Sequence, residues 1–130
     1  MTDTFTIDGK NVSDISSFYD EINRVFMADE DWKLGPSLDA LNDMFHGGVG
    51  AIKGNGPVTL IWKEMEKNRT DLGVEVTRRF YLGKLESPEQ YDVMRIKRDL
   101  AELENGTGPT YFEIVLQVIA DHPNITLLPR

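Results

Sequence analysis

The pattern of hydrophobic and polar positions predicts short strands separated by helices. Residues 4–7 alternate between polar and apolar side chains, which is typical of a strand with one buried face. Residues 58–63 are rich in β-formers and apolar on both sides, so we expect a central strand that is covered on both faces. Residues 125–128 follow the break at Pro123 and form a third predicted strand.

Apolar residues at helical spacing fill the stretches between these strands. The expected helices run from Ser13 or Ser16 to Phe26, from Ser37 to His46, over residues 64–72, from Ser87 to Glu104, and from Thr110 to Pro123. Ser87 is the expected N-cap of the fourth helix, with Pro88 in the first helical position. Thr110 and Glu113 form a capping box, whereas residues 74–82 fit either a helix or a strand.

Three strands joined through helices imply an α/β fold, in which a small three-stranded parallel sheet is packed with helices. The 130 residues are most simply one domain. The chain has no cysteine, so neither disulfides nor thiolate metal sites are expected. No apolar run approaches the roughly 20 residues that cross a bilayer, and the first residues lack a secretory pattern. We therefore expect a cytoplasmic protein.

The predicted helix over residues 38–46 has two faces of different chemistry. Its apolar positions are Leu38, Leu41 and Phe45, and its polar positions are Asp39, Asn42, Asp43 and His46. Helical spacing gathers each of these sets on one side of the helix. The segment before it adds three acids and a tryptophan, namely Asp29, Glu30, Asp31 and Trp32. An acidic face with so little compensating positive charge favours a cationic partner.

The charge of the whole chain points in the same direction. The sequence contains 22 acidic and 14 basic residues, which gives a net charge of −8. A charge of this sign argues against nucleic acid or an anionic membrane as a direct ligand. A basic protein or a cationic small molecule is the better match.

Motifs for catalysis are weak. Residues 48–53 begin like a dinucleotide-binding loop, but the third glycine is missing and no helix follows. His122 lies at a helix end, where we expect it to complement the helix dipole and the last carbonyls. Asp39, Asp43 and His46 could hold a divalent metal, although the sequence offers no obvious further ligands. A metal site, a solvated surface and a protein-binding face thus remain the alternatives for this helix.

Four segments of the chain together resemble one known protein family. Residues 35–45 read GPSLDALNDMF and are similar to that family's second helix. Residues 7–26 resemble its first strand, turn and helix, residues 58–63 its second strand, and residues 116–128 its last helix and strand. The family is barstar, a group of intracellular ribonuclease inhibitors. The resemblance implies a barstar-like fold with an inserted helical region over about residues 64–107.

The resemblance also implies a function and a set of contact residues. In this family the second helix and the loop before it block the active site of a ribonuclease. By position, Asp39 and Asp43 match the two inhibitory aspartates, with Asp43 at the phosphate-binding centre of the enzyme. Gly35 and Leu38 match the close-packing positions beside them. Asp121 matches a supplementary acid on the last helix.

The chain also departs from the family pattern. Lys33 stands where the family has an aromatic residue, although Trp32 comes one position earlier. Asn42 stands where the family has a tryptophan, and Pro36 and Ser37 replace the residues that start the helix. Tight inhibition of barnase itself is therefore not expected.

The sequence leads to one main hypothesis and one alternative. The hypothesis is a protein that is not an enzyme, uses no cofactor or metal, and neutralises a basic ribonuclease or ribonuclease toxin domain as an immunity protein. The expected partner-binding residues are Trp32, Lys33, Gly35, Leu38, Asp39, Asn42, Asp43, His46 and Asp121. The alternative is a barstar-fold interaction or regulatory module with a non-nuclease partner. Its working surface would be the inserted helices, around residues 91–103.

Overall fold

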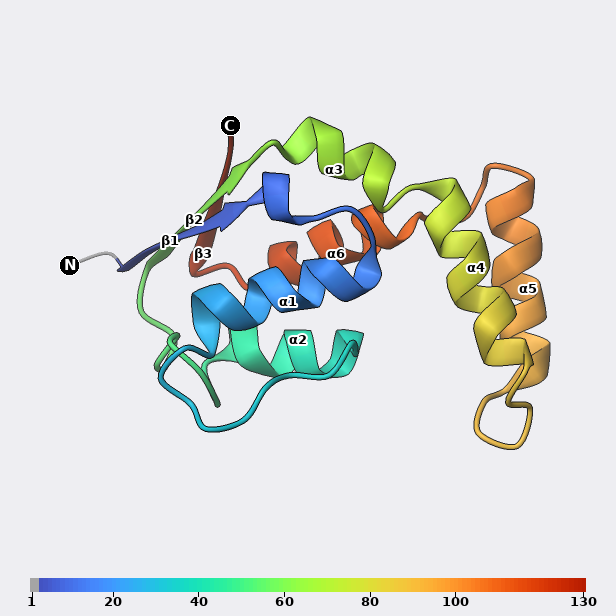
Figure 1. Ribbon diagram of the computed structural model, residues 1–130, viewed down its shortest axis with the longest axis horizontal. Helices are drawn as coiled ribbons and strands as arrows, with labels where there is room; N and C mark the ends of the chain where they lie inside the picture. Colours follow the sequence, from blue (N-terminus) through green and yellow to red (C-terminus); the bar gives the residue numbers. More distant parts are fainter. Residues whose placement is uncertain (1–2) are drawn as a thin grey trace.

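The computed structural model describes residues 3–130, which form one three-stranded sheet with helices packed against it (Figure 1). The elements are β1 (Asp3–Asp8), the 3-10 turn η1 (Gly9–Asn11), α1 (Ile15–Phe26), α2 (Leu38–His46), β2 (Val58–Lys63), α3 (Met65–Asp71), α4 (Val74–Leu85), α5 (Val93–Glu104), α6 (Tyr111–Ala120) and β3 (Ile125–Pro129). The strands are parallel, in the order β1-β2-β3. The predicted sheet, with residues 58–63 at its centre, is therefore confirmed. Within the described residues, no helix is long and apolar enough to cross a bilayer.

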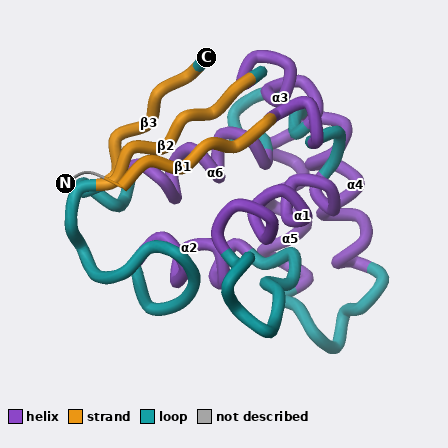
Figure 2. Tube along the Cα trace, turned by 60° about the vertical axis from the view of Figure 1, so that its left-hand side comes forward, coloured by secondary structure: helices purple, strands orange, loops and turns teal. Residues whose placement is uncertain are grey.

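Helices cover one face of the sheet. Figure 2 shows α1, α2 and α6 on the same side of the three strands. On β2, Val58, Leu60 and Trp62 are buried beneath them, whereas Thr59 and Ile61 point the other way and stay partly exposed. The expectation that this strand is covered on both faces is wrong. Its outer face does not need cover, because Thr59 continues a row of threonines across all three strands in the sheet register, which water can solvate.

The core between the sheet and the helices is rich in aromatic side chains. Trp62 is fully buried, and its ring lies 5.5 Å from that of Phe112 between centroids. Its indole Nε1 donates a hydrogen bond of 2.7 Å to Oδ1 of the buried Asn68. The hydroxyls of Tyr19 and Tyr111 are 2.7 Å apart and join α1 to α6. These hydrogen bonds between buried polar atoms fix α3 against β2 and α1 against α6.

The first helix begins at a different cap from the one we predicted. Neither Ser13 nor Ser16 is the N-cap. Asp14 takes that position, its carboxylate accepts the backbone N–H of Ser17 at 2.8 Å, and the Ser17 hydroxyl accepts the N–H of Asp14 in return. The sequence offers several capping residues in a row here, and a carboxylate also favours the positive end of the helix dipole. The capping box predicted at Thr110 is confirmed.

Residues 74–82, which fit either a helix or a strand in the sequence, form an α-helical hairpin with the helix that follows them. Residues 74–82 belong to α4, which continues to Leu85. The helix start predicted at Ser87 is wrong, because residues 87–90 make a turn in which the N–H of Gln90 donates to the carbonyl of Ser87 at 3.0 Å. The helix α5 begins at Val93 with Asp92 as its N-cap. A serine followed by proline suits the start of a turn as well as the start of a helix.

The α4–α5 hairpin stands beside the body of the protein and has an apolar cluster of its own (Figure 1). Tyr81, Ile96 and Leu103 are its buried members. The ring of Phe80 packs edge-on against that of Tyr111 at 5.1 Å and connects the hairpin to α6. The hairpin is thus attached to the core near α6, while its far end lies away from the sheet.

Candidate partner-binding site

The helix α2 is short, and both of its ends are fixed by local interactions. The hydroxyl of Ser37 accepts the N–H of Ala40 at 3.3 Å and caps the first turn. The helix ends at Gly47, whose φ of +96° lies in the left-handed region. A Cβ at this position would lie 2.3 Å from the carbonyl oxygen of Gly54, so the close approach requires glycine. The predicted start and end of this helix are confirmed.

The two predicted faces of α2 differ in burial as expected. Leu41, Met44 and Phe45 are buried against the core, and Leu38 is half-buried at the start of the helix. The opposite face is exposed and consists of Asp39, Asn42, Asp43 and His46. Burial of the apolar side therefore presents these four side chains to solvent in a fixed arrangement.

The two carboxylates on this face are not neutralised by the fold. Among residues 3–130, no Lys or Arg nitrogen lies within 4.0 Å of Asp39 or Asp43. Their spacing of four residues places them one turn apart, where like charges are mildly destabilising in a helix. Only Asp39 is in the first turn, where the dipole favours an anion. The pair therefore creates a local negative potential that a cationic group would relieve.

A hydrogen bond between helices fixes the C-terminal half of α2. Nε2 of His122 lies 2.9 Å from Oδ1 of Asn42, and His122 is largely buried just beyond the end of α6. The imidazole thus joins α2 to α6, and the predicted role in capping its own helix is wrong. Burial lowers the pKa of His122, and His46 lowers it further, against an opposing effect of Asp121. Because an amide oxygen can only accept, Nε2 of His122 is the donor in this bond, and Asn42 positions α2 as well as facing solvent.

The loop before α2 is tied to α1 through one side chain. The N–H of Leu34 donates to Oδ1 of Asn23 at 2.8 Å, and Nδ2 of Asn23 donates to the Leu34 carbonyl at 3.1 Å. Leu34 is buried, whereas Trp32, Lys33 and Gly35 around it are exposed. A Cβ on Gly35 would meet no atom within 4 Å, which leaves open space over this backbone. Asn23 was not among the residues that we predicted, and its polar side chain within the α1 pattern gave no sign of this contact.

The structure brings most of the predicted residues onto one surface. The exposed loop that carries Trp32, Lys33 and Gly35 leads directly into the start of α2. The rings of His46 and His122 are 6.0 Å apart between centroids, and this contact places the exposed Asp121 close to the same surface. Within the described part of the chain, no three His, Cys, Asp or Glu side chains gather closely enough to hold a metal ion. We call the exposed residues of α2, its preceding loop and Asp121 the acidic face.

The comparison with known families identifies the scaffold beneath the acidic face. Residues 2–81 match the family described as Barstar (barnase inhibitor). The match covers more than half of the chain, from β1 through the loop, α2 and β2 into α4, and thus enters the region over residues 64–107 that we expect to be inserted. No curated protein matches the chain. Members of the family bind ribonucleases of the barnase type and are inhibitors rather than enzymes. With its parallel sheet and surrounding helices, this chain belongs to the barstar family.

Proposed function

We propose that this protein binds a cognate ribonuclease and blocks its active site with the acidic face. It acts as a cytoplasmic immunity protein for a ribonuclease toxin, and it performs no catalysis of its own. The observation that carries the proposal is the pair of exposed, unpaired carboxylates of Asp39 and Asp43 on a helix fixed at both ends. The family match supports a ribonuclease as the class of partner.

The chemistry of ribonucleases explains why such a face would bind. An enzyme that cleaves RNA must stabilise the charge of a phosphate, so its active site is lined with cationic side chains. Carboxylates on a rigid helix can accept charge-assisted hydrogen bonds from the same side chains. Because α2 is held by Ser37, Gly47 and the His122–Asn42 bond, little conformational entropy is lost when it docks. The net charge of −8 would also steer a basic enzyme towards the inhibitor.

The direct test measures inhibition of a candidate enzyme. The probes are purified basic ribonucleases of the barnase type, each assayed for RNA cleavage at increasing inhibitor concentration. We expect inhibition by the wild type and a loss of affinity of about 10- to 150-fold for Asp43→Ala, the range for one hydrogen bond to a charged group. Glu102→Ala is the matched control, because Glu102 is an exposed helical acid on α5, away from the acidic face.

Three outcomes would contradict the proposal. If the wild type fails to inhibit the enzyme, a ribonuclease is the wrong partner. Inhibition that is equally sensitive to Asp43→Ala and Glu102→Ala would show that only the overall charge matters. Binding of a non-nuclease protein that survives Asp43→Ala would favour the interaction-module alternative. As a further check, the association rate should fall as salt rises, because screening shortens the reach of the charges to about 3 Å at 1 M.

A further inference from the structure

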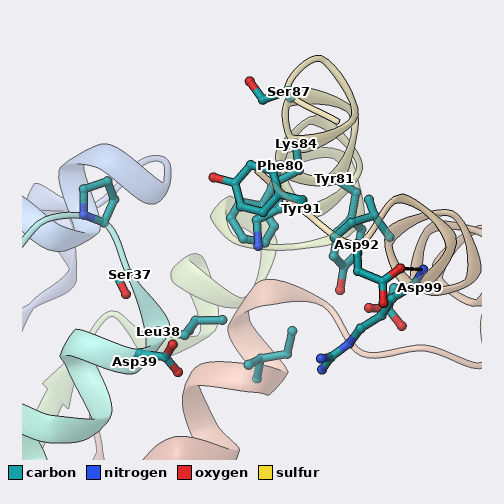
Figure 3. A pocket seen from close by; sticks show the side chains of 15 residues that line it. Ser37, Leu38, Asp39, Phe80, Tyr81, Lys84, Ser87, Tyr91, Asp92 and Asp99 are labelled. Carbon is teal, nitrogen blue, oxygen red and sulfur yellow. Dashed lines mark hydrogen bonds between the residues drawn. The ribbon is translucent and has the colours of Figure 1, made fainter. Parts of the chain in front are cut away.

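A cleft lies beside the acidic face, between the start of α2 and the α4–α5 hairpin. It has a volume of about 780 Å³. Figure 3 shows Leu38 and Asp39 on the α2 side and Lys84, Phe80 and Tyr91 on the hairpin side. Because Asp39 belongs to both surfaces, the cleft is a direct continuation of the acidic face.

The hairpin side of the cleft presents two cations without a close ion-pair partner, Lys84 and Arg95, beside the acids Asp92 and Asp99. Among residues 3–130, neither Lys84 nor Arg95 has a carboxylate within 4.0 Å, whereas Arg78 on the same hairpin pairs with Glu75 and Glu104. The difference is one of position, since Arg78 joins the two helices of the hairpin and the cleft residues face open space. Lys84 and Arg95 are therefore available to an anionic group from outside.

Aromatic rings hold Lys84 in place. Its Nζ lies 4.3 Å from the centroid of the Phe80 ring and 5.2 Å from that of Tyr91. Partial burial lowers the pKa of Lys84, and Arg95 lowers it further, while Asp99 and Asp39 oppose the change. An incoming carboxylate would stabilise the charged form of this lysine, because an opposite charge at short range offsets the cost of burial.

The size of a stable interface also indicates that the acidic face does not act alone. A protein–protein interface of standard size involves about 20–30 residues and about 800 Å² on each partner. One short helix, its loop and Asp121 supply far fewer residues than this. An enzyme centred on α2 must therefore contact neighbouring surfaces, and the cleft borders α2 at Asp39. The exposed ring of Tyr91 suits such a contact, since tyrosine is enriched at the centres of interfaces.

We propose that this cleft receives a projecting segment from the rim of the ribonuclease active site, with a carboxylate that pairs with Lys84 and Arg95. The inference rests on the proposed function and assigns the hairpin a second part of the same interface. Five charged residues line the cleft, namely Asp39, Lys84, Asp92, Arg95 and Asp99. Pockets for small molecules are mostly apolar with few polar groups, so this lining favours a charged protein segment. The neighbouring Asp39 would bind a basic residue of the enzyme next to that carboxylate.

The test reverses the two cations and measures the dissociation constant. The protein carrying Lys84→Glu and Arg95→Glu is titrated with the barnase-type ribonuclease that the wild type inhibits. We expect binding about tenfold weaker or more, because two like-charge contacts replace two attractive ones. Lys97→Glu with Arg98→Glu is the matched control, since both residues are exposed on α5 and neither lines the cleft. It should change the dissociation constant by less than about threefold.

A second variant guards against an effect on folding. Lys84→Met with Arg95→Met removes both charges, keeps side chains of similar length, and should weaken binding less than the reversal does. Thermal unfolding of each variant shows whether the hairpin is intact. If Asp43→Ala weakens binding but both cleft variants bind like the wild type, the cleft inference is wrong and the proposed function stands. If Lys97→Glu with Arg98→Glu weakens binding as much as the cleft reversal, the effect is one of net charge and the inference fails. If the wild type does not bind, both fail.

Discussion

The link between Asn23 and Leu34 gives a prediction that can be worked out from the structure. The Asn23 side chain makes two hydrogen bonds to the backbone of Leu34, which tie the loop before α2 to α1. The change Asn23→Ala removes both and leaves the buried N–H and carbonyl of Leu34 without these partners. The loop would then be held by the buried Leu34 side chain, by the turn from Glu30 to Met27, and by the distant pair of Glu30 with Lys53, 3.8 Å apart.

The expected magnitude follows from these two bonds. Each contributes a net of about 0.5–1.5 kcal/mol, so local opening of the loop should become easier by about 1–3 kcal/mol. This corresponds to exchange of the Leu34 amide hydrogen that is about 5- to 150-fold faster. Global stability should fall by less, because the core residues beneath the loop keep their contacts. If the loop contacts the ribonuclease, affinity should fall by up to the same factor, because the loop must then be ordered on binding.

Native-state hydrogen exchange followed residue by residue is the assay. Asn105→Ala is the matched control, because the Asn105 side chain bonds to Thr107 at the far end of α5. This substitution should leave the exchange rate of the Leu34 amide unchanged. Unchanged exchange at Leu34 in a folded Asn23→Ala protein would refute the view that this asparagine anchors the loop. Equally fast exchange throughout the sheet would also refute it, since the change would then be a global loss of stability.

Two further predictions concern stability. Both carboxylate oxygens of Glu21 accept hydrogen bonds, from Asp8, Asn11 and Arg24. In Glu21→Gln the amide NH₂ must face one of these donors, so the free energy of unfolding measured in urea should fall by about 2–4 kcal/mol. The control Glu66→Gln, in an exposed ion pair with the same spacing, should lower it by under about 0.5 kcal/mol. Burial acts to raise the pKa of Glu21, but these hydrogen bonds outweigh it and keep the pKa low. The stabilisation by Glu21 is therefore present above the ordinary pKa of 4.5 and should shrink as pH falls below it. A difference in unfolding free energy between wild type and Glu21→Gln that is constant with pH would contradict this. A Cβ at Gly83 within α4 meets open space, so Gly83→Ala should raise the free energy of unfolding by about 0.5–1 kcal/mol. Gly47 has a positive φ, so Gly47→Ala should lower it by about 1 kcal/mol or more. Thermal unfolding that shows both substitutions shifting stability in the same direction would contradict this reasoning.

The parts of the fold with strong local signals could be predicted from the sequence. The strands could be predicted because residues 4–7 alternate, residues 58–63 are rich in β-formers, and Pro123 separates the last strand from its helix. The helix α2 could be predicted because Ser37 and Gly47 mark its ends. The start of α5 was missed because Ser87 and Pro88 suit a turn as well as a helix. The choice depends on contacts between α4 and α5, such as those of Tyr81, Ile96 and Leu103, which are distant in sequence.

The same limit applies to the candidate site. The polar side of α2 could be recognised from spacing alone, since Asp39 and Asp43 are one turn apart. The bond from His122 to Asn42 joins residues 80 positions apart, and no local pattern encodes it. The cleft beside Asp39 depends on the angle at which the hairpin leaves the core, which is a property of tertiary packing.

The separate apolar cluster of the α4–α5 hairpin has a consequence for how such a protein can diversify. A substitution on the outer surface of the hairpin disturbs the contacts around Tyr81, Ile96 and Leu103 at most, and the packing beneath α2 is unaffected. If the hairpin contacts the enzyme as proposed, it can accumulate changes that alter recognition without disturbing the packing that holds α2 and the sheet. Selection can then adjust specificity in one part of the chain without a compensating change in the other.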